Sequence, residues 1–236
     1  MTIRQEGSYY LDFDDSENVS TAIGIDSKNM VAVIKEAQDK YTSLFGHSSF
    51  GFKEDKLDFL NQLPETKKIW FWDVELSSVE GIYAPKNITE LGVFGKYPSI
   101  DYSRLSSLKE LIWHFRKKDK GILNLEKLEL FHVWHVNPKE KTFRVVPIPK
   151  NINELQVIWA NPICLDGIPQ LLKLKNLELH RCRNLSSIDG IEKIAPNLER
   201  INIENSSKLT DFSPLKKLKK LKEAWFNDDE LLLSKI

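Results

Sequence analysis

Apolar side chains recur along most of the chain in a short period that is neither helical nor purely alternating. In residues 174–203, one short alternation (Leu177, Leu179) is followed by an apolar residue or cysteine at every third position as far as Ile194. The series begins again at Leu198. A single helix would need apolar positions at 3.6-residue spacing, and a hairpin would need alternation broken by a short turn. The pattern is typical of a repeat built from a short strand and a return segment.

These units can be phased by the first inward residue of each strand, which we call the anchor. The anchor and the residue two positions later should point into the core, and most intervals fall within the roughly 20–29 residues expected for such repeats. The phase is irregular around Leu128, where a short interval is followed by a long one containing the insert 136–151. We interpret this insert as an added strand or a cover for an edge, with a binding loop as the alternative. The anchors are Ile69, Leu91, Leu111, Leu128, Leu155, Leu177, Ile201 and Ala224.

Literal repetition supports this phase. The segment PKNITEL (85–91) returns as PKNINEL (149–155), and LSSVEGI (76–82) returns as LSSIDGI (185–191). Near the C-terminus, residues 209–221 read LTDFSPLKKLKKL. These motifs resemble the repeats of bacterial leucine-rich-repeat proteins of the internalin type.

The resemblance covers roughly residues 41–227 and implies an α/β solenoid, a leucine-rich-repeat horseshoe segment with parallel strands on its concave face. We expect about eight to nine repeats over 41–227, with an N-terminal α/β cap over 1–40 and a C-terminal cap or tail over 228–236. The cap should contain a hairpin and a helix with Met30, Val31, Val33, Ile34 and Ala37 on its apolar side. Small relatives without an export signal include immunity proteins that neutralise bacterial toxins, although this fold does not by itself fix a function.

Charge and composition indicate which kind of molecule this chain binds and in which compartment it works. The chain has 236 residues, and its 34 lysines and arginines balance 34 aspartates and glutamates, whereas a nucleic-acid binder normally carries a basic excess. The first fifteen residues contain no apolar stretch typical of a secretory signal, and no apolar run is long enough to span a membrane. Cys164 and Cys182 fit a reduced compartment, with Cys182 at an inward turn position. We therefore expect a cytoplasmic bacterial protein that binds another protein, with no membrane and no nucleic acid as its partner.

No stretch of the sequence predicts catalysis. The chain has no GxSxG, P-loop or GxGxxG motif. His132 and His135 lie three residues apart near Glu129, but this spacing matches no strong zinc motif and no cysteine is nearby. The lysines of 216–222 alternate with inward leucines and are interpreted as a solvated face, with contact to an acidic partner or a phosphate backbone as the alternative. We expect no enzyme activity, no cofactor and no metal site.

The strand residues that alternate with the core positions predict the binding surface. Neighbouring residues on a strand point to opposite faces, so side chains one and three positions after each anchor should face the concave side. Many of them are aromatic, and contiguous exposed apolar rows are typical of interfaces. The expected binding residues are Trp70, Trp72, Phe94, Ile112, His114, Phe131, Ile158, Glu178 and His180.

We expect this surface to occlude a partner protein, as an immunity or regulatory protein would. One alternative is a scaffold without an inhibitory role. Another is a carbohydrate or nucleic-acid binder that stacks its ligand on Trp70, Trp72 and Phe94. A purely structural interpretation also stays open, in which the N-terminal cap or the insert covers these rings and makes them part of the core.

Overall fold

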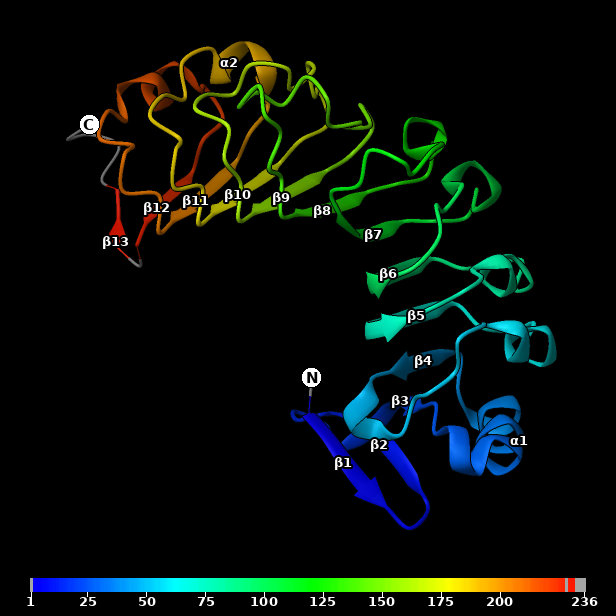
Figure 1. The fold of residues 1–236 in the computed structure, drawn as a ribbon. Helices are drawn as coiled ribbons and strands as arrows, with labels where there is room; N and C mark the ends of the chain where they lie inside the picture. Colours follow the sequence, from blue (N-terminus) through cyan, green and yellow to red (C-terminus); the bar gives the residue numbers. More distant parts are fainter. Residues whose placement is uncertain (1, 228, 232–236) are drawn as a thin grey trace. The chain divides into compact units, whose positions relative to one another are not determined.

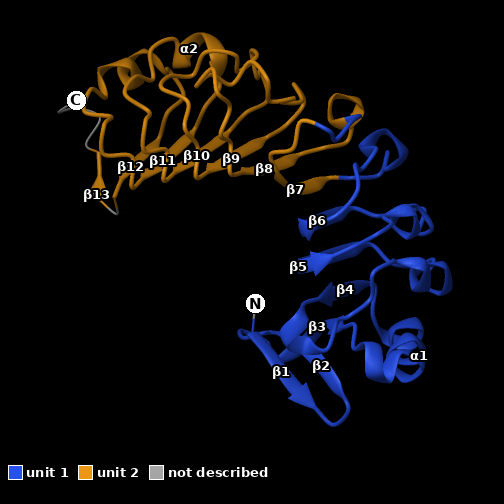
Figure 2. Ribbon diagram, in the orientation of Figure 1, with its two compact units in different colours: residues 1–108, 118–121 blue, residues 109–117, 122–236 orange. Residues whose placement is uncertain are grey.

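The computed structural model describes residues 2–227 and 229–231, and the chain divides into two compact units. Unit 1 comprises residues 1–108 and 118–121, and unit 2 comprises residues 109–117 and 122–236 (Figure 2). Within the described ranges, thirteen strands follow the order of the chain in an open, mostly parallel sheet with few helices (Figure 1). No helix in the part of the chain that the structure describes is long and apolar enough to cross a membrane.

Unit 1 begins with an antiparallel meander and continues with parallel strands. The meander consists of β1 (Thr2–Glu6), β2 (Tyr9–Asp14) and β3 (Val19–Gly24). The parallel strands are β4 (Ser43–Gly46), β5 (Lys68–Glu75) and β6 (Glu90–Lys96). The helix α1 (Met30–Lys40) connects β3 to β4, and the short 3-10 helices are η1 (Ser27–Asn29), η2 (Ser48–Phe50), η3 (Asp58–Gln62), η4 (Glu80–Tyr83) and η5 (Tyr102–Arg104).

The hairpin and the helix expected in residues 1–40 are both present, and β1 adds a third strand. The carboxylate of Asp26 accepts a hydrogen bond from the backbone N–H of Lys28, which caps the turn that leads into α1. The helix buries Val33 and Ile34 as predicted, but Val31 is 85% exposed. The predicted apolar side was too wide, because Val31 lies outside the stripe that the buried residues form on a 3.6-residue helix.

Unit 2 repeats one strand and one return segment. The parallel strands are β7 (Glu110–His114), β8 (Leu130–Trp134), β9 (Glu154–Ile158), β10 (Asn176–His180), β11 (Arg200–Glu204) and β12 (Glu223–Phe226). β13 (Asp229–Glu230) pairs antiparallel with β12. The return segments contain η6 (Ile122–Asn124), α2 (Ile191–Ile194) and η7 (Ser213–Lys217). Of the expected tail 228–236, residues 228 and 232–236 lie outside the described residues.

Strand alternation places every second side chain in the core of unit 2. On β10, Leu177 is 2% exposed and Leu179 is fully buried, whereas Glu178 between them is half-buried. The return segments supply the opposite wall of this core, and Cys182 lies in it at the inward turn with 1% exposure, as predicted. Because the strands pair in register, equivalent residues form rows with a spacing of about 4.8 Å.

The predicted phase is wrong in one repeat. Leu111 pairs with Phe131, and Phe131 pairs with Leu155, so Phe131 is the anchor of this strand instead of Leu128. Both candidates are fully buried, because Leu128 lies in the turn before β8 and also faces the core. The sequence is therefore compatible with two anchors that lie three residues apart, Leu128 and Phe131. The pairing of β8 with its neighbouring strands shows that Phe131 is the anchor. The intervals around this strand become 20 residues (111 to 131) and 24 residues (131 to 155).

The insert 136–151 contributes side chains to the core and forms no strand. Phe143, Val146 and Ile148 are 2–6% exposed, whereas Val145 is 38% exposed. The insert therefore has a structural role in the core, as one interpretation of the sequence expects. Its side chains fill the core, however, and the expected added strand does not form.

Candidate binding surface

The front face of unit 2 is the face of β7–β12 that is turned away from the return segments. It presents the side chains that alternate with the core positions, and those one and three positions after each anchor are half-buried from β7 to β11. These residues are Ile112, His114, His132, Trp134, Gln156, Ile158, Glu178, His180, Asn202 and Glu204. Five residues expected from the sequence, Ile112, His114, Ile158, Glu178 and His180, therefore lie on this face.

Two other expected residues are not accessible. Phe131 is fully buried and stacks on Trp113 with 6.1 Å between ring centroids. The corrected phase places His132 and Trp134 on the front face in its stead. In unit 1, Phe94 is 8% exposed, because the ring of Trp70 packs against it with 5.2 Å between centroids. The expectation of an accessible ring is wrong for Phe131 and for Phe94.

Trp70 and Trp72 lie in an aromatic cluster of unit 1. Trp72 stacks on His47 with 5.1 Å between centroids and lies 6.2 Å from Phe45. Trp70 lies over Gly92, where a Cβ atom would come within 2.6 Å of the indole, so the glycine makes room for the ring. Both tryptophans are half-buried. Phe45, His47 and Phe94 thus cover these rings in part, and they belong neither to the cap 1–40 nor to the insert 136–151 that the structural interpretation names.

At the carboxyl ends of β7–β10, unit 2 gathers a cluster that we call the aromatic corner: His114, Trp134, His135, Trp159 and Arg181. His114 and Trp134 stack at 5.9 Å, and Trp134 meets Trp159 edge to face at 5.5 Å. The ring of His135 lies parallel to Trp159 at 4.7 Å, and the guanidinium of Arg181 lies 5.3 Å from the Trp159 centroid. His135 and Arg181 reach Trp159 from the turns after β8 and β10, the two strands that flank β9.

The backbone of the corner is left-handed at three positions. His135, Trp159 and Arg181 each follow the last residue of a strand, with φ of 58°, 53° and 54°. Asn205 occupies the equivalent position after β11, and Asp73 does so after the Trp72 position in unit 1. A left-handed conformation costs most L-residues about 1–2 kcal/mol and is most easily adopted by Asn and Asp. Tryptophan and arginine thus retain a strain that Asn would reduce, and strained residues of this kind gather at functional sites.

A pocket of about 380 Å³ opens beside the corner. Its wall carries two guanidinium groups and no carboxylate, so it suits an anionic group of a partner. The lining residues are Asn137, Trp159, Ala160, Asn161, Arg181, Arg183 and Asn184.

His114 gives the corner an uncharged aromatic side chain at neutral pH. Burial lowers the pKa of His114 from 6.5 to about 4, and the electrostatic interactions with His135 and Arg116 act in the same direction. The ring therefore packs against Trp134 without the cost of desolvating an imidazolium.

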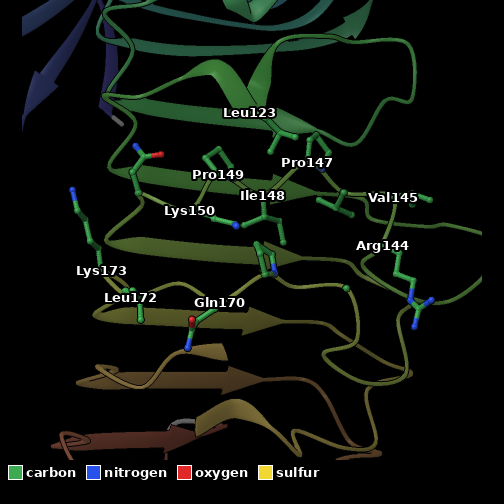
Figure 3. Close-up of a pocket in the computed structure, with 14 residues that line it drawn as sticks. Leu123, Arg144, Val145, Pro147, Ile148, Pro149, Lys150, Gln170, Leu172 and Lys173 are labelled. Atoms are coloured by element: carbon green, nitrogen blue, oxygen red, sulfur yellow. The ribbon is translucent and has the colours of Figure 1, made fainter. Parts of the chain in front are cut away.

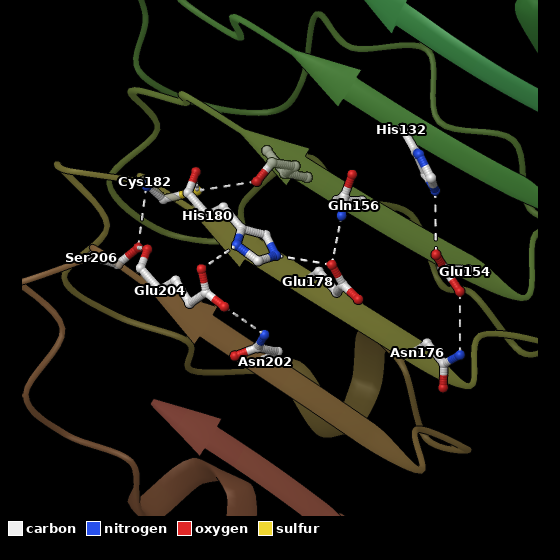
Figure 4. Close-up of polar contacts among 11 residues, drawn as sticks. His132, Glu154, Gln156, Asn176, Glu178, His180, Cys182, Asn202, Glu204 and Ser206 are labelled. Atoms are coloured by element: carbon white, nitrogen blue, oxygen red, sulfur yellow. Dashed lines mark hydrogen bonds and ion pairs between the residues drawn. The ribbon is translucent and has the colours of Figure 1, made fainter. Parts of the chain in front are cut away.

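Beside the corner, the front face holds His180 between two carboxylates (Figure 4). Nε2 of His180 lies 2.9 Å from Glu178 Oε2, and Nδ1 lies 2.9 Å from Glu204 Oε2. Gln156 donates to Glu178 over 2.6 Å, and Asn202 donates to Glu204 over 3.0 Å. An imidazole can donate from both nitrogens only when it is protonated, so this network fits an imidazolium.

The pKa values in this network agree with a charged state. The hydrogen bond with Glu178 raises the pKa of His180, against the opposing effect of burial, and Glu204 adds to the rise. The hydrogen bond from His180 lowers the pKa of Glu178, and the hydrogen bond from Asn202 lowers that of Glu204. Two carboxylates around one imidazolium leave this part of the front face acidic.

Unit 2 also contains the two histidines and the cysteine that could suggest a metal site or a nucleophile: His132, His135 and Cys182. His132 lies 3.2 Å from Glu154 Oε1, and His135 stacks on Trp159, so the two histidines have separate neighbours. Among the described residues, no group of three His, Cys, Asp or Glu side chains could hold a metal ion. Burial raises the pKa of the Cys182 thiol to about 12, so this residue is no thiolate nucleophile at neutral pH.

Three residues of the aromatic corner lie one position beyond the strand rows, so the alternation of the strands does not predict them. His135, Trp159 and Arg181 occupy the turns that follow β8, β9 and β10. Asn205 gives the available signal, because Asn directly after a strand is typical of a left-handed turn. A tryptophan at the same repeat position stands out once that turn is identified.

Comparison with models of known protein families gives no match for this chain. Function is therefore inferred from the geometry of the front face and the aromatic corner.

Proposed function

We propose that this chain is a non-catalytic protein-binding module and that the front face of unit 2 engages another protein. The aromatic corner is the observation that carries this proposal. It concentrates tryptophan, histidine and arginine side chains at the ends of adjacent strands, and Trp159 stays 36% exposed. Tryptophan and arginine are the residues most enriched among binding hot spots.

The His180 network supports a proposal for the chemistry of the partner. Glu178 and Glu204 present carboxylates next to an apolar corner, which suits a partner surface with arginine or amide donors beside an apolar side chain. Their hydrogen bonds within the chain orient these carboxylates before binding, which lowers the entropy cost of association.

We further propose that binding occludes the partner, in the manner of a cytoplasmic bacterial immunity or regulatory protein with leucine-rich repeats. The in-register strands and the resemblance of residues 209–221 to internalin-type repeats support this class. Stacking of a sugar or a base on Trp159 is less favoured, because His135 already stacks on this ring and the guanidinium of Arg181 lies 5.3 Å from its centroid. The carboxylates of Glu178 and Glu204 would also repel a phosphate backbone.

The test is affinity capture from the native cell with matched variants as bait. Trp134→Ala combined with Trp159→Asn removes two aromatic rings, and Asn tolerates the left-handed turn. Lys217→Ala with Lys220→Ala, on the exposed return side, is the control. Losing two anchors at about 2 kcal/mol each weakens binding roughly a thousandfold, at 1.4 kcal/mol per tenfold change.

We expect the same partner protein on the wild type and on the lysine variant, but not on the tryptophan variant. Thermal melting checks that all three baits are folded. Equal capture by the three baits would remove the front face as the binding surface, and capture of nucleic acid or glycan in place of protein would contradict the proposed class of partner. A change in the activity of the captured protein distinguishes occlusion from a scaffold.

A further inference from the structure

A groove of about 950 Å³ crosses the return segments of unit 2 (Figure 3). Three successive return segments line it, with Leu123 after β7, residues 144–151 between β8 and β9, and residues 167–173 between β9 and β10. The groove therefore lies on the side of unit 2 opposite to the front face and shares no lining residue with the aromatic corner.

The walls of the groove are apolar and held in place by the core. Val146 and Ile148 are 6% and 3% exposed, so the segment between β8 and β9 is anchored from below. Three side chains nevertheless remain open to solvent: Leu123 is 64%, Leu172 57% and Val145 38% exposed. The prolines Pro147, Pro149 and Pro169 stiffen the same walls. Exposed apolar residues that converge on one concavity mark a binding site, whereas scattered ones do not.

The rim of the groove is basic. Arg144, Lys150 and Lys173 belong to its lining, which contains no aspartate or glutamate. Arg144 pairs with Asp166 at 2.7 Å outside the groove, whereas Lys150 and Lys173 are exposed and form no ion pair with another described residue. In a chain whose total charge is zero, this is a local excess of cations around an apolar concavity.

We propose that the groove docks a linear segment of a partner protein in which apolar side chains are flanked by aspartate or glutamate. The apolar walls take the apolar side chains, and the charges of Lys150 and Lys173 select the flanking carboxylates. A membrane surface fits less well, because the apolar side chains line a concavity and do not project toward a flat bilayer. This site is independent of the front face and goes beyond the proposed function.

The experiment selects random 12-residue peptides, displayed on phage, against the full chain. Leu123→Glu combined with Leu172→Glu serves for counter-selection. Both leucines are more than half exposed, so this variant should melt like the wild type. We expect enriched peptides that combine apolar residues with Asp or Glu, and a fluorescent synthetic copy should bind the double leucine variant at least about tenfold more weakly.

Two further variants test the contribution of the lysine charges and the location of the peptide site. Lys150→Glu with Lys173→Glu should weaken the peptide about tenfold, and the loss should shrink at high salt because exposed charges are screened. Trp134→Ala on the front face should leave peptide binding unchanged. The proposal is overturned if no peptide is enriched, if the enriched peptides are basic or uncharged, or if they bind the leucine variant equally well. Sedimentation that shows a dimer of wild type, but not of the leucine variant, would make a second copy of the chain the occupant instead.

Discussion

Replacing Phe131 by alanine tests the strand phase that places the front face. Phe131 has no exposed surface, stacks on Trp113 and pairs in register between Leu111 and Leu155. Truncating a fully buried phenylalanine removes its transfer free energy and leaves a cavity, which together cost about 3–5 kcal/mol. Trp134, three residues later, is half-buried on the front face. Because part of its surface stays in contact with solvent, its replacement by alanine should cost about 1–2 kcal/mol.

Urea unfolding followed by circular dichroism measures this difference, since the shift in midpoint multiplied by the m-value gives the change in stability. For a chain of this size, the Phe131→Ala loss corresponds to a fall in melting temperature of roughly 10 °C. Phe131→Leu keeps most of the volume and should cost less than about 1.5 kcal/mol. The corrected phase would be refuted if Phe131→Ala cost less than Trp134→Ala, because Phe131 would then face the solvent side of the sheet.

Three other predictions follow from buried, charged and strained side chains. In a Cys164→Ser variant, Cys182 should react with thiol reagents only as fast as the chain unfolds, because burial raises its pKa to about 12; prompt labelling would contradict its inward position. Proton NMR titration should find the pKa of His114 near 4 and that of His180 above 6.5. The stability that His180 contributes is then present below about pH 6.5 and is lost as the pH rises through its folded pKa. His114 acts in the opposite direction and lowers the stability of the fold as the pH falls from 6.5 toward 4. Titration of both histidines near 6.5 would contradict these two pH dependences. Arg181→Asn should leave the free energy of unfolding unchanged or raise it by up to about 1 kcal/mol, and a larger loss by chemical denaturation would show that the contact with Trp159 outweighs the backbone strain.

The strands of unit 2 could be predicted because one face of each is buried and the other is not. Leu177 and Leu179 enclose the half-buried Glu178, and this alternation is legible in the sequence. It failed at β8, where Leu128 and Phe131 are both buried. A turn residue that faces the core has the same hydropathy as a strand residue, so the choice depends on pairing with β7 and β9, which is a non-local property.

Two features of unit 1 were hidden for other physical reasons. The strand Thr2–Glu6 is half-buried or exposed along its whole length, so its sequence carries no apolar alternation and only pairing with β2 makes it a strand. Phe94 follows the alternation and was expected to be accessible. It is covered because Gly92 lets the ring of Trp70 lie across it, a packing of side chains from different strands that spacing cannot reveal.

In the aromatic corner, the strain of the left-handed backbone opposes the favourable contacts of the side chains. Each left-handed residue there costs about 1–2 kcal/mol, and a ring stack such as His135 on Trp159 returns about 0.5–1.5 kcal/mol beyond burial. The contact of Arg181 with that indole adds about 0.5–1 kcal/mol at an exposed site. At Arg181, the backbone strain and the contact with the indole therefore nearly cancel, so this residue contributes little to the stability of the fold. What the corner provides is a set of side chains held in position at the edge of the front face. Replacing Arg181 by Asn should therefore affect a bound partner more than the melting temperature, whereas replacing Phe131 by Ala should do the reverse.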